Sequence, residues 1–172
     1  MQKVLLVVLA ALVLSVPAYA QETGLMDKNE VQLAAAWADV ADVSATLLAA
    51  HYGRFITPNI QAQLGVIWAD IDFEGSNVSA FAIAPAIAYY FIGENTTNIV
   101  PYLGVGYYFL NADAAEEGSI NENGLEAFGG VKFFVGGDYL TSNRAFFVEY
   151  RYLNDVFGDN VSAVMVGITN FF

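Results

Sequence analysis

The sequence contains no cysteine, which excludes disulfide bonds and metal sites built on thiolates. It is also poor in positive charge, because 6 Lys and Arg stand against 18 Asp and Glu, a formal net charge of −12. Binding to nucleic acid requires a basic surface that neutralises phosphates. We therefore expect no nucleic-acid partner for this chain.

An apolar run as long as a transmembrane helix is also absent. Residues 4–13 are apolar, but a membrane-spanning helix needs about 20 such residues. Lys3 precedes this run and Ala18-Tyr19-Ala20 follows it, a pattern typical of a signal peptide with its small-x-small cleavage site. We expect a signal peptide over residues 1–20 and a mature domain over residues 21–172, without a lipoprotein cysteine.

The mature domain is rich in apolar and aromatic residues that alternate with small or polar ones. This alternation predicts strands at residues 29–38, 44–56, 60–71, 78–92, 99–111, 123–135, 145–153 and 161–172. Segments of this length suit the tilted strands of a transmembrane barrel. An exported apolar chain without transmembrane helices can cross a membrane only as a closed barrel. The sequence therefore predicts an all-β fold, an eight-stranded antiparallel up-and-down transmembrane β-barrel with both termini in the periplasm.

Several motifs resemble those of one known family. They are the turn Phe55-Ile56-Thr57-Pro58-Asn59, the segment Val100-Pro101-Tyr102-Leu103-Gly104-Val105-Gly106-Tyr107, the segment Phe147-Val148-Glu149-Tyr150-Arg151-Tyr152, and the terminal aromatic residue. On these motifs the whole mature chain resembles the small outer-membrane β-barrel proteins typified by the barrel domain of outer membrane protein A.

The resemblance implies an integral protein of the Gram-negative outer membrane, porin-like, monomeric and without a cofactor. Its implied partners are outer-membrane lipid, lipopolysaccharide, the barrel assembly machinery and periplasmic chaperones. The family's terminal assembly signal is matched by Gly167 and Phe172, whereas Met165 and Asn170 depart from it. We do not expect a peptidoglycan-binding domain after the last strand.

The alternation also places charged side chains inside the barrel. The predicted interior residues are Arg54, Glu126, Lys132, Glu149 and Arg151, together with the amides Gln61 and Gln63. An eight-stranded barrel is only wide enough for side chains to fill, and a buried charge needs a partner. We therefore predict a salt-bridge network that plugs the lumen. A gated ion path through a narrow channel is the alternative.

His51 is the only histidine, and the alternation assigns it to the outer face as an interfacial residue. The outer-membrane lipid A deacylases have a His-x-Ser pattern, and His51-Tyr52-Gly53 does not match it. Palmitoyl-transferring barrels need an Asp-Ser pair, and the sequence has none. We therefore predict no catalytic residue and no enzyme activity, with an outer-membrane lipid-modifying enzyme as the less favoured reading.

Acidic residues gather in the segments predicted to form outer loops. The strongest groups are Asp70, Asp72 and Glu74, and Asp113, Glu116 and Glu117. A self-repelling, solvated rim is the simpler interpretation. The sharper hypothesis is weak binding of Ca²⁺ or Mg²⁺ that bridges the rim to lipopolysaccharide phosphates. No loop has the spacing of an EF-hand, so we expect no dedicated metal site.

Overall fold

The computed structural model describes residues 25, 28–40, 43–73, 76–93, 98–114, 118–156 and 158–172. Its elements are β1 (Asn29–Val40), β2 (Val43–Phe55), β3 (Ile60–Phe73), β4 (Ser76–Tyr90), β5 (Ile99–Ala114), β6 (Gly118–Phe134), β7 (Arg144–Val156) and β8 (Asp159–Phe171). Within these ranges no helix is long and apolar enough to cross a membrane. The predicted signal peptide, residues 1–20, lies outside the described residues.

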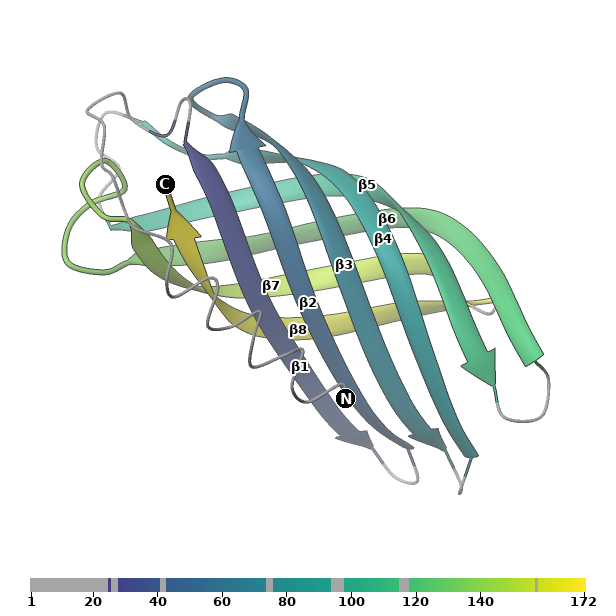
Figure 1. Cartoon of the computed structure of the whole chain (residues 1–172). Helices are drawn as coiled ribbons and strands as arrows, with labels where there is room; N and C mark the ends of the chain where they lie inside the picture. The colour runs from purple at the N-terminus through teal and green to yellow at the C-terminus, as the bar shows by residue number, and fades with distance from the viewer. Residues whose placement is uncertain are drawn as a thin grey trace.

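The eight strands form one closed barrel in which each strand pairs antiparallel with its neighbours in sequence, and β1 pairs with β8 (Figure 1). The prediction of an eight-stranded up-and-down barrel is confirmed. Asn29 and Phe172 exchange backbone hydrogen bonds of 2.8 and 3.0 Å, so the barrel begins and ends at the same edge. We call this edge the terminal end. The opposite edge, with the β1–β2, β3–β4, β5–β6 and β7–β8 hairpins, is the distal end.

The longest strands exceed their predicted lengths at the distal end. The residues from 112 to 122 were expected to form a loop, yet β5 and β6 continue in one register to the pair Ala114↔Gly118. Polar side chains support the extension, because Asn111 Nδ2 donates to Ser119 Oγ and to Asn121 Oδ1, both at 2.9 Å. Ladder pairing and polar cross-strand bonds thus extend the hairpin where the apolar alternation stops.

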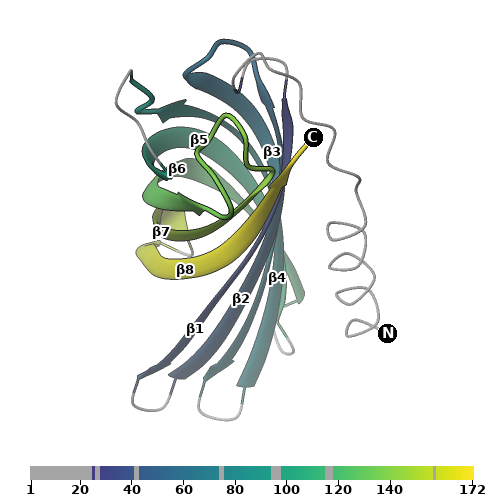
Figure 2. The same cartoon turned by 90° about the vertical axis from the view of Figure 1, so that its left-hand side faces the viewer.

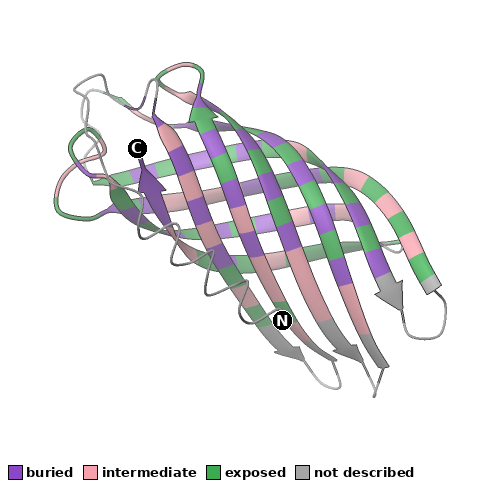
Figure 3. Cartoon of the chain, viewed as in Figure 1, coloured by how far each residue is buried: buried purple, intermediate pink, exposed green. Residues whose placement is uncertain are grey.

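Burial follows the alternation of side chains across each strand (Figure 3). On β4 the large residues Phe81, Ile83 and Ile87 are exposed, whereas Ala82 and Ala84 are buried. Exposed large hydrophobic side chains occur on the outer face of all eight strands. A water-soluble barrel or sandwich buries its large apolar residues, so the arrangement is apolar outside and small or polar inside.

The predicted faces of β2 are wrong and must be exchanged. Arg54 is exposed, whereas His51 is 4% exposed and Phe55 1%. Pairing with β1 fixes this orientation, because Gln32, which is buried, pairs with His51. Arg54 lies one residue before the end of β2, where a long cationic side chain on the outer face can reach water. The Arg54 charge can therefore be hydrated on the outer face and does not need a partner inside the barrel.

The interior contains two apolar clusters. Toward the terminal end, aromatic rings predominate, with Phe55 against Tyr90 at 4.9 Å and Phe134 against Phe171 at 5.3 Å between centroids. Toward the distal end the cluster consists mainly of alanine and aliphatic residues, contributed by every strand except β6. The bulky rings and the polar groups described next occupy the terminal half and middle of the lumen.

Candidate functional site in the barrel interior

Two groups of buried polar side chains cross the lumen. The Glu30 cluster consists of Glu30, Gln61, Gln63, Tyr90, Lys132 and Thr169. The Arg151 cluster, one level nearer the distal end, consists of Tyr102, Glu126, Glu149 and Arg151. Every strand except β2 contributes a residue to one of the clusters, so the clusters connect opposite walls of the barrel.

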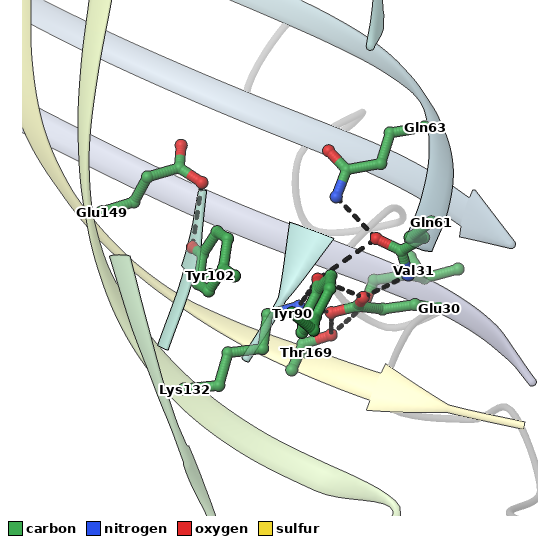
Figure 4. Close-up of polar contacts among 9 residues, drawn as sticks. All are labelled: Glu30, Val31, Gln61, Gln63, Tyr90, Tyr102, Lys132, Glu149 and Thr169. Atoms are coloured by element: carbon green, nitrogen blue, oxygen red, sulfur yellow. Dashed lines mark hydrogen bonds and ion pairs between the residues drawn. The ribbon is translucent and has the colours of Figure 1, made fainter. Parts of the chain in front are cut away.

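Glu30 accepts hydrogen bonds and an ion pair from across the barrel (Figure 4). Gln61 Nε2 and the Tyr90 hydroxyl donate to Glu30 Oε2 at 2.6 and 3.1 Å. Lys132 Nζ and Thr169 Oγ1 bind Glu30 Oε1. Both carboxylate oxygens are thus compensated, which a charge removed from water requires.

Lys132 is fully buried and has two kinds of partner. Besides Glu30, its ammonium group donates to the Tyr90 hydroxyl at 2.7 Å. It also lies 4.9 Å from the ring centroid of Tyr90, 5.2 Å from that of Tyr102 and 5.3 Å from that of Phe171. Aromatic faces attract cations at these distances. The ammonium group is therefore held by one carboxylate and a cage of rings.

Arg151 joins two carboxylates in the second cluster. Its Nε and Nη2 bind Glu149 Oε1 at 3.0 and 2.9 Å, and its Nη1 binds Glu126 Oε2 at 3.0 Å. The Tyr102 hydroxyl donates to Glu149 Oε2 at 2.9 Å, and the guanidinium carbon lies 4.7 Å from the Phe128 ring centroid. Glu126 Oε1 has no hydrogen-bond partner among the described residues. One cation here faces two carboxylates.

Glycines on neighbouring strands make room for these long side chains. A Cβ on Gly53 would lie 2.6 Å from Gln61 Cδ, and one on Gly106 would lie 2.5 Å from Glu126 Oε1. Both distances are too short for real contacts. The interior polar side chains therefore lie flat over backbone that carries no side chain of its own.

The structure brings together four of the five charged residues predicted for the lumen. Glu126, Lys132, Glu149 and Arg151 are buried and ion-paired, whereas Arg54 is exposed. Sequence reasoning missed Glu30, the acceptor at the centre of the first cluster. The available signal was its spacing, since Glu30 lies two residues before Gln32 and so shares the inward face.

His51 was predicted on the outer face and lies inside, so that prediction is corrected. Neither of its ring nitrogens has a hydrogen-bond partner among the described residues. A catalytic base needs an orienting partner and a nearby nucleophile. No three His, Cys, Asp or Glu side chains gather into a metal site in the described part of the chain.

Two groups outside the strands at the terminal end have shifted pKa values, Asp138 in the β6–β7 turn and Lys28 just before β1. Asp138 Oδ1 accepts from the backbone amides of Thr141 and Leu140, both at 3.0 Å, and from the Thr141 hydroxyl. The bonds from Thr141 contribute most to lowering the pKa of Asp138. Lys28 Nζ donates to the Leu140 carbonyl at 3.2 Å, and burial lowers the pKa of Lys28 while Asp138 opposes the shift.

Of the six acidic residues proposed as a cation-binding rim, only Asp70 has a described side chain. Its Oδ1 accepts from Ser79 Oγ at 3.3 Å. The side chains of Asp72, Glu74, Asp113, Glu116 and Glu117 lie outside the described residues. Rim cation binding stays a prediction.

The two residues of the proposed assembly signal lie on the seam between β8 and β1. Gly167 pairs with Ala34 of β1 and with Phe147 of β7. Phe172 exchanges backbone hydrogen bonds with Asn29. Their placement gives both residues a role in barrel closure, and their reading by the assembly machinery stays a prediction.

Comparison with known proteins finds no matching family description and no matching curated protein. Solved structures do match. Neisserial surface protein A has 18% identity and a TM-score of 0.61, over 84% of this chain and 95% of that one. The N-terminal β-barrel domain of Pseudomonas aeruginosa OprF has 14% identity and a TM-score of 0.58, over 86% and 98%. The Pseudomonas aeruginosa outer membrane protein OprG has 11% identity and a TM-score of 0.57, over 88% and 99%. The chain therefore has the fold of the small eight-stranded outer-membrane β-barrels.

Proposed function

We propose that this chain is an integral protein of the bacterial outer membrane, with a structural or surface-interaction role in the cell envelope. The observation that carries the proposal is the belt of exposed large hydrophobic side chains on all eight strands. Water-soluble proteins rarely expose apolar surface of that extent. Lipid is the solvent that suits an apolar exterior combined with ion pairs in the interior.

The filled lumen favours a structural role over a channel. The Glu30 and Arg151 clusters are buried, ion-paired and surrounded by aromatic rings, so these described side chains fill the terminal half of the lumen. Moving an ion past them would require the pairs to separate in a medium where each charge is costly. A narrow ion channel is therefore the second candidate.

Conductance in planar bilayers tests this choice. The purified protein, refolded and inserted, should show no discrete current steps. Steps that change in Glu149→Gln or Arg151→Gln would favour a channel. Arg54→Gln is the matched control, because it removes a positive charge on the outer face and should leave any current unchanged.

An outer-membrane lipid-modifying enzyme is less well supported. His51 is enclosed and lacks hydrogen-bonded partners among the described residues, so no proton relay is assembled around it. Loss of a measurable lipid-modifying activity in His51→Ala, with folding intact, would reverse this assignment.

The proposal includes an orientation and a set of partners. With both termini in the periplasm, the distal hairpins face the cell exterior, where lipopolysaccharide is the adjacent lipid. The terminal end then faces the periplasmic chaperones and the assembly machinery. Protease added to intact cells should cut epitope tags placed in the distal hairpins and leave a tag at the carboxyl terminus uncut.

A further inference from the structure

An apolar cavity of about 240 Å³ lies in the distal half of the barrel. Its wall consists largely of small and aliphatic side chains that face the lumen, among them Leu47, Ile67, Ala82 and Leu110. None of the described residues that line it is charged. A cavity lined mainly by apolar side chains accepts apolar ligands.

The cavity is closed toward the terminal end. On β8 the fully buried Met165 follows the cavity residue Ala163. On β7 Arg151, with its ion pairs, lies next along the inward face from the cavity residue Leu153. Phe147 is buried in the same apolar cluster as Met165. An occupant cannot continue along the barrel axis past these side chains.

The cavity opens sideways between β1 and β8. Their ladder ends at the pair Ala35↔Val166, although both strands continue toward the distal end. In Figure 2 the two strands lie together near the carboxyl terminus and separate beyond it. The cavity wall includes Trp37, 72% exposed, and Val164, 61% exposed, which point outward from β1 and β8. The lumen thus meets the lipid-facing surface at this seam.

The depth of the seam in the membrane limits which molecules can enter the cavity; this inference rests on the proposed membrane location. A membrane-crossing strand needs about 9–11 residues, whereas β1 pairs with the carboxyl-terminal strand only over residues 29–35. The seam therefore opens within the membrane span, toward its distal side. Unpaired backbone N–H and C=O groups are costly in hydrocarbon, so the free edges of β1 and β8 favour an occupant that can form hydrogen bonds.

We propose that this cavity binds a single-chain amphiphile, which enters laterally from the membrane. Its alkyl chain lies against Ala82, Ile67 and Leu110, and its polar head forms hydrogen bonds with the free strand edges and the hydroxyls of Thr46 and Ser162 at the cavity wall. The volume is below the roughly 300–1,000 Å³ of pockets for drug-sized ligands, which suits one chain and excludes a complete two-chain lipid. Because lipid tails are as apolar as leucine, moving an alkyl chain from the membrane into the cavity brings no hydrophobic gain. Binding is favoured instead by dispersion contacts between the chain and the cavity wall.

Contact quenching by bromine tests whether a chain enters. Trp37→Phe and Trp68→Phe remove both native tryptophans, and Tyr108→Trp then places one indole in the cavity wall. The protein is inserted into phosphatidylcholine vesicles with bromine on the acyl chains, or into unbrominated vesicles containing dibromostearic acid. Val105→Trp, on the lipid face, and Phe128→Trp, in the buried aromatic cluster, are the matched reporters in the same background.

The cavity indole should be quenched as strongly as the lipid-facing one, and the Phe128→Trp indole should not. Quenching by dibromostearic acid is the result expected for a single-chain amphiphile, whereas equal quenching by brominated phosphatidylcholine would show that a tail of a two-chain lipid enters and would overturn the single-chain assignment. Adding Ala82→Leu, which narrows the cavity, should abolish the quenching, whereas Ala127→Leu on the outer face should not.

A cavity indole that neither quencher reaches, while Val105→Trp is quenched, would overturn the proposal and leave the membrane location intact. Quenching that persists unchanged with Ala82→Leu would also overturn it. A lipid-facing indole that escapes quenching would show that the barrel is not embedded, and both proposals would then fail.

Discussion

Glu30 and Lys132, 102 positions apart in the sequence, form a fully buried ion pair that joins β1 to β6 across the barrel. The carboxylate also accepts from Gln61, Tyr90 and Thr169. Because β1 pairs only with β2 and β8, the ion pair connects β1 to a wall that the sheet does not join to it directly. These side-chain contacts hold the opposite walls of the terminal half in place.

Removing the carboxylate should destabilise the barrel strongly. Glu30→Ala leaves the Lys132 ammonium group buried without its counter-charge, which typically costs about 3–5 kcal/mol. Urea unfolding in detergent micelles, followed by tryptophan fluorescence, measures the change. Glu30→Gln with Lys132→Met should cost much less, since no charge is left alone. Arg54→Ala, at an exposed position, is the control, and an equal effect there would argue against a role for the ion pair.

Variants of Gly167 and Phe172 should distinguish a defect in barrel closure from a defect in recognition by the assembly machinery. A Cβ on Gly167 would collide with the Leu33 carbonyl oxygen and the Phe147 ring, so Gly167→Ala should cost about 1–3 kcal/mol by overpacking. The defect should appear in refolding of the purified protein from urea. Phe172→Ala should refold normally and accumulate poorly in the outer membrane of cells. Normal refolding of Gly167→Ala would contradict the structural role of this glycine.

Disulfide mapping tests where the β1–β8 seam opens, and the absence of cysteine makes the background clean. Ala35→Cys with Val166→Cys places the thiols on directly paired residues, at Cα separations of about 4.5–5.5 Å that a disulfide tolerates. Trp37→Cys with Val164→Cys occupies the next outward-facing positions, where the ladder has ended. Mild oxidation should cross-link the first pair and not the second, as seen on non-reducing gels. Equal yields would mean that the ladder continues.

The lipid-facing belt makes a prediction about charge. Leu103→Arg, on the outer face of β5, should cost about 2–4 kcal/mol if the residue lies near the bilayer midplane. Leu140→Arg adds the same group in the exposed β6–β7 turn and should be nearly neutral. Unfolding in lipid vesicles compares the two variants. Equal tolerance would place residue 103 outside the membrane.

The barrel could be predicted from the sequence because its signal is local and repeated. Alternation along each segment defines which residues share a face, and eight such segments imply closure. The prediction of which face of β2 points inward was wrong because both faces are similarly apolar. The single charged residue, Arg54, then determined the assignment. Pairing with β1 was the missing constraint, since Gln32 opposite His51 determines the inward face.

The partners inside the lumen could not be predicted in the same way. Glu30 and Lys132 meet because the strand register and curvature bring them together, and no local pattern encodes that distance. The open seam was equally hidden, because Ala36, Trp37 and Val164 continue the alternation of β1 and β8 without a break. Only the end of the ladder in three dimensions distinguishes these positions from their paired neighbours.

Membrane extraction combined with gel mobility tests the central claim most directly. A barrel embedded through its apolar belt should stay in the outer-membrane pellet after washing with urea. It should also migrate differently in SDS before and after boiling, because the closed barrel resists the detergent until it is heated. Release into the urea supernatant, with a single mobility in both samples, would contradict a transmembrane barrel.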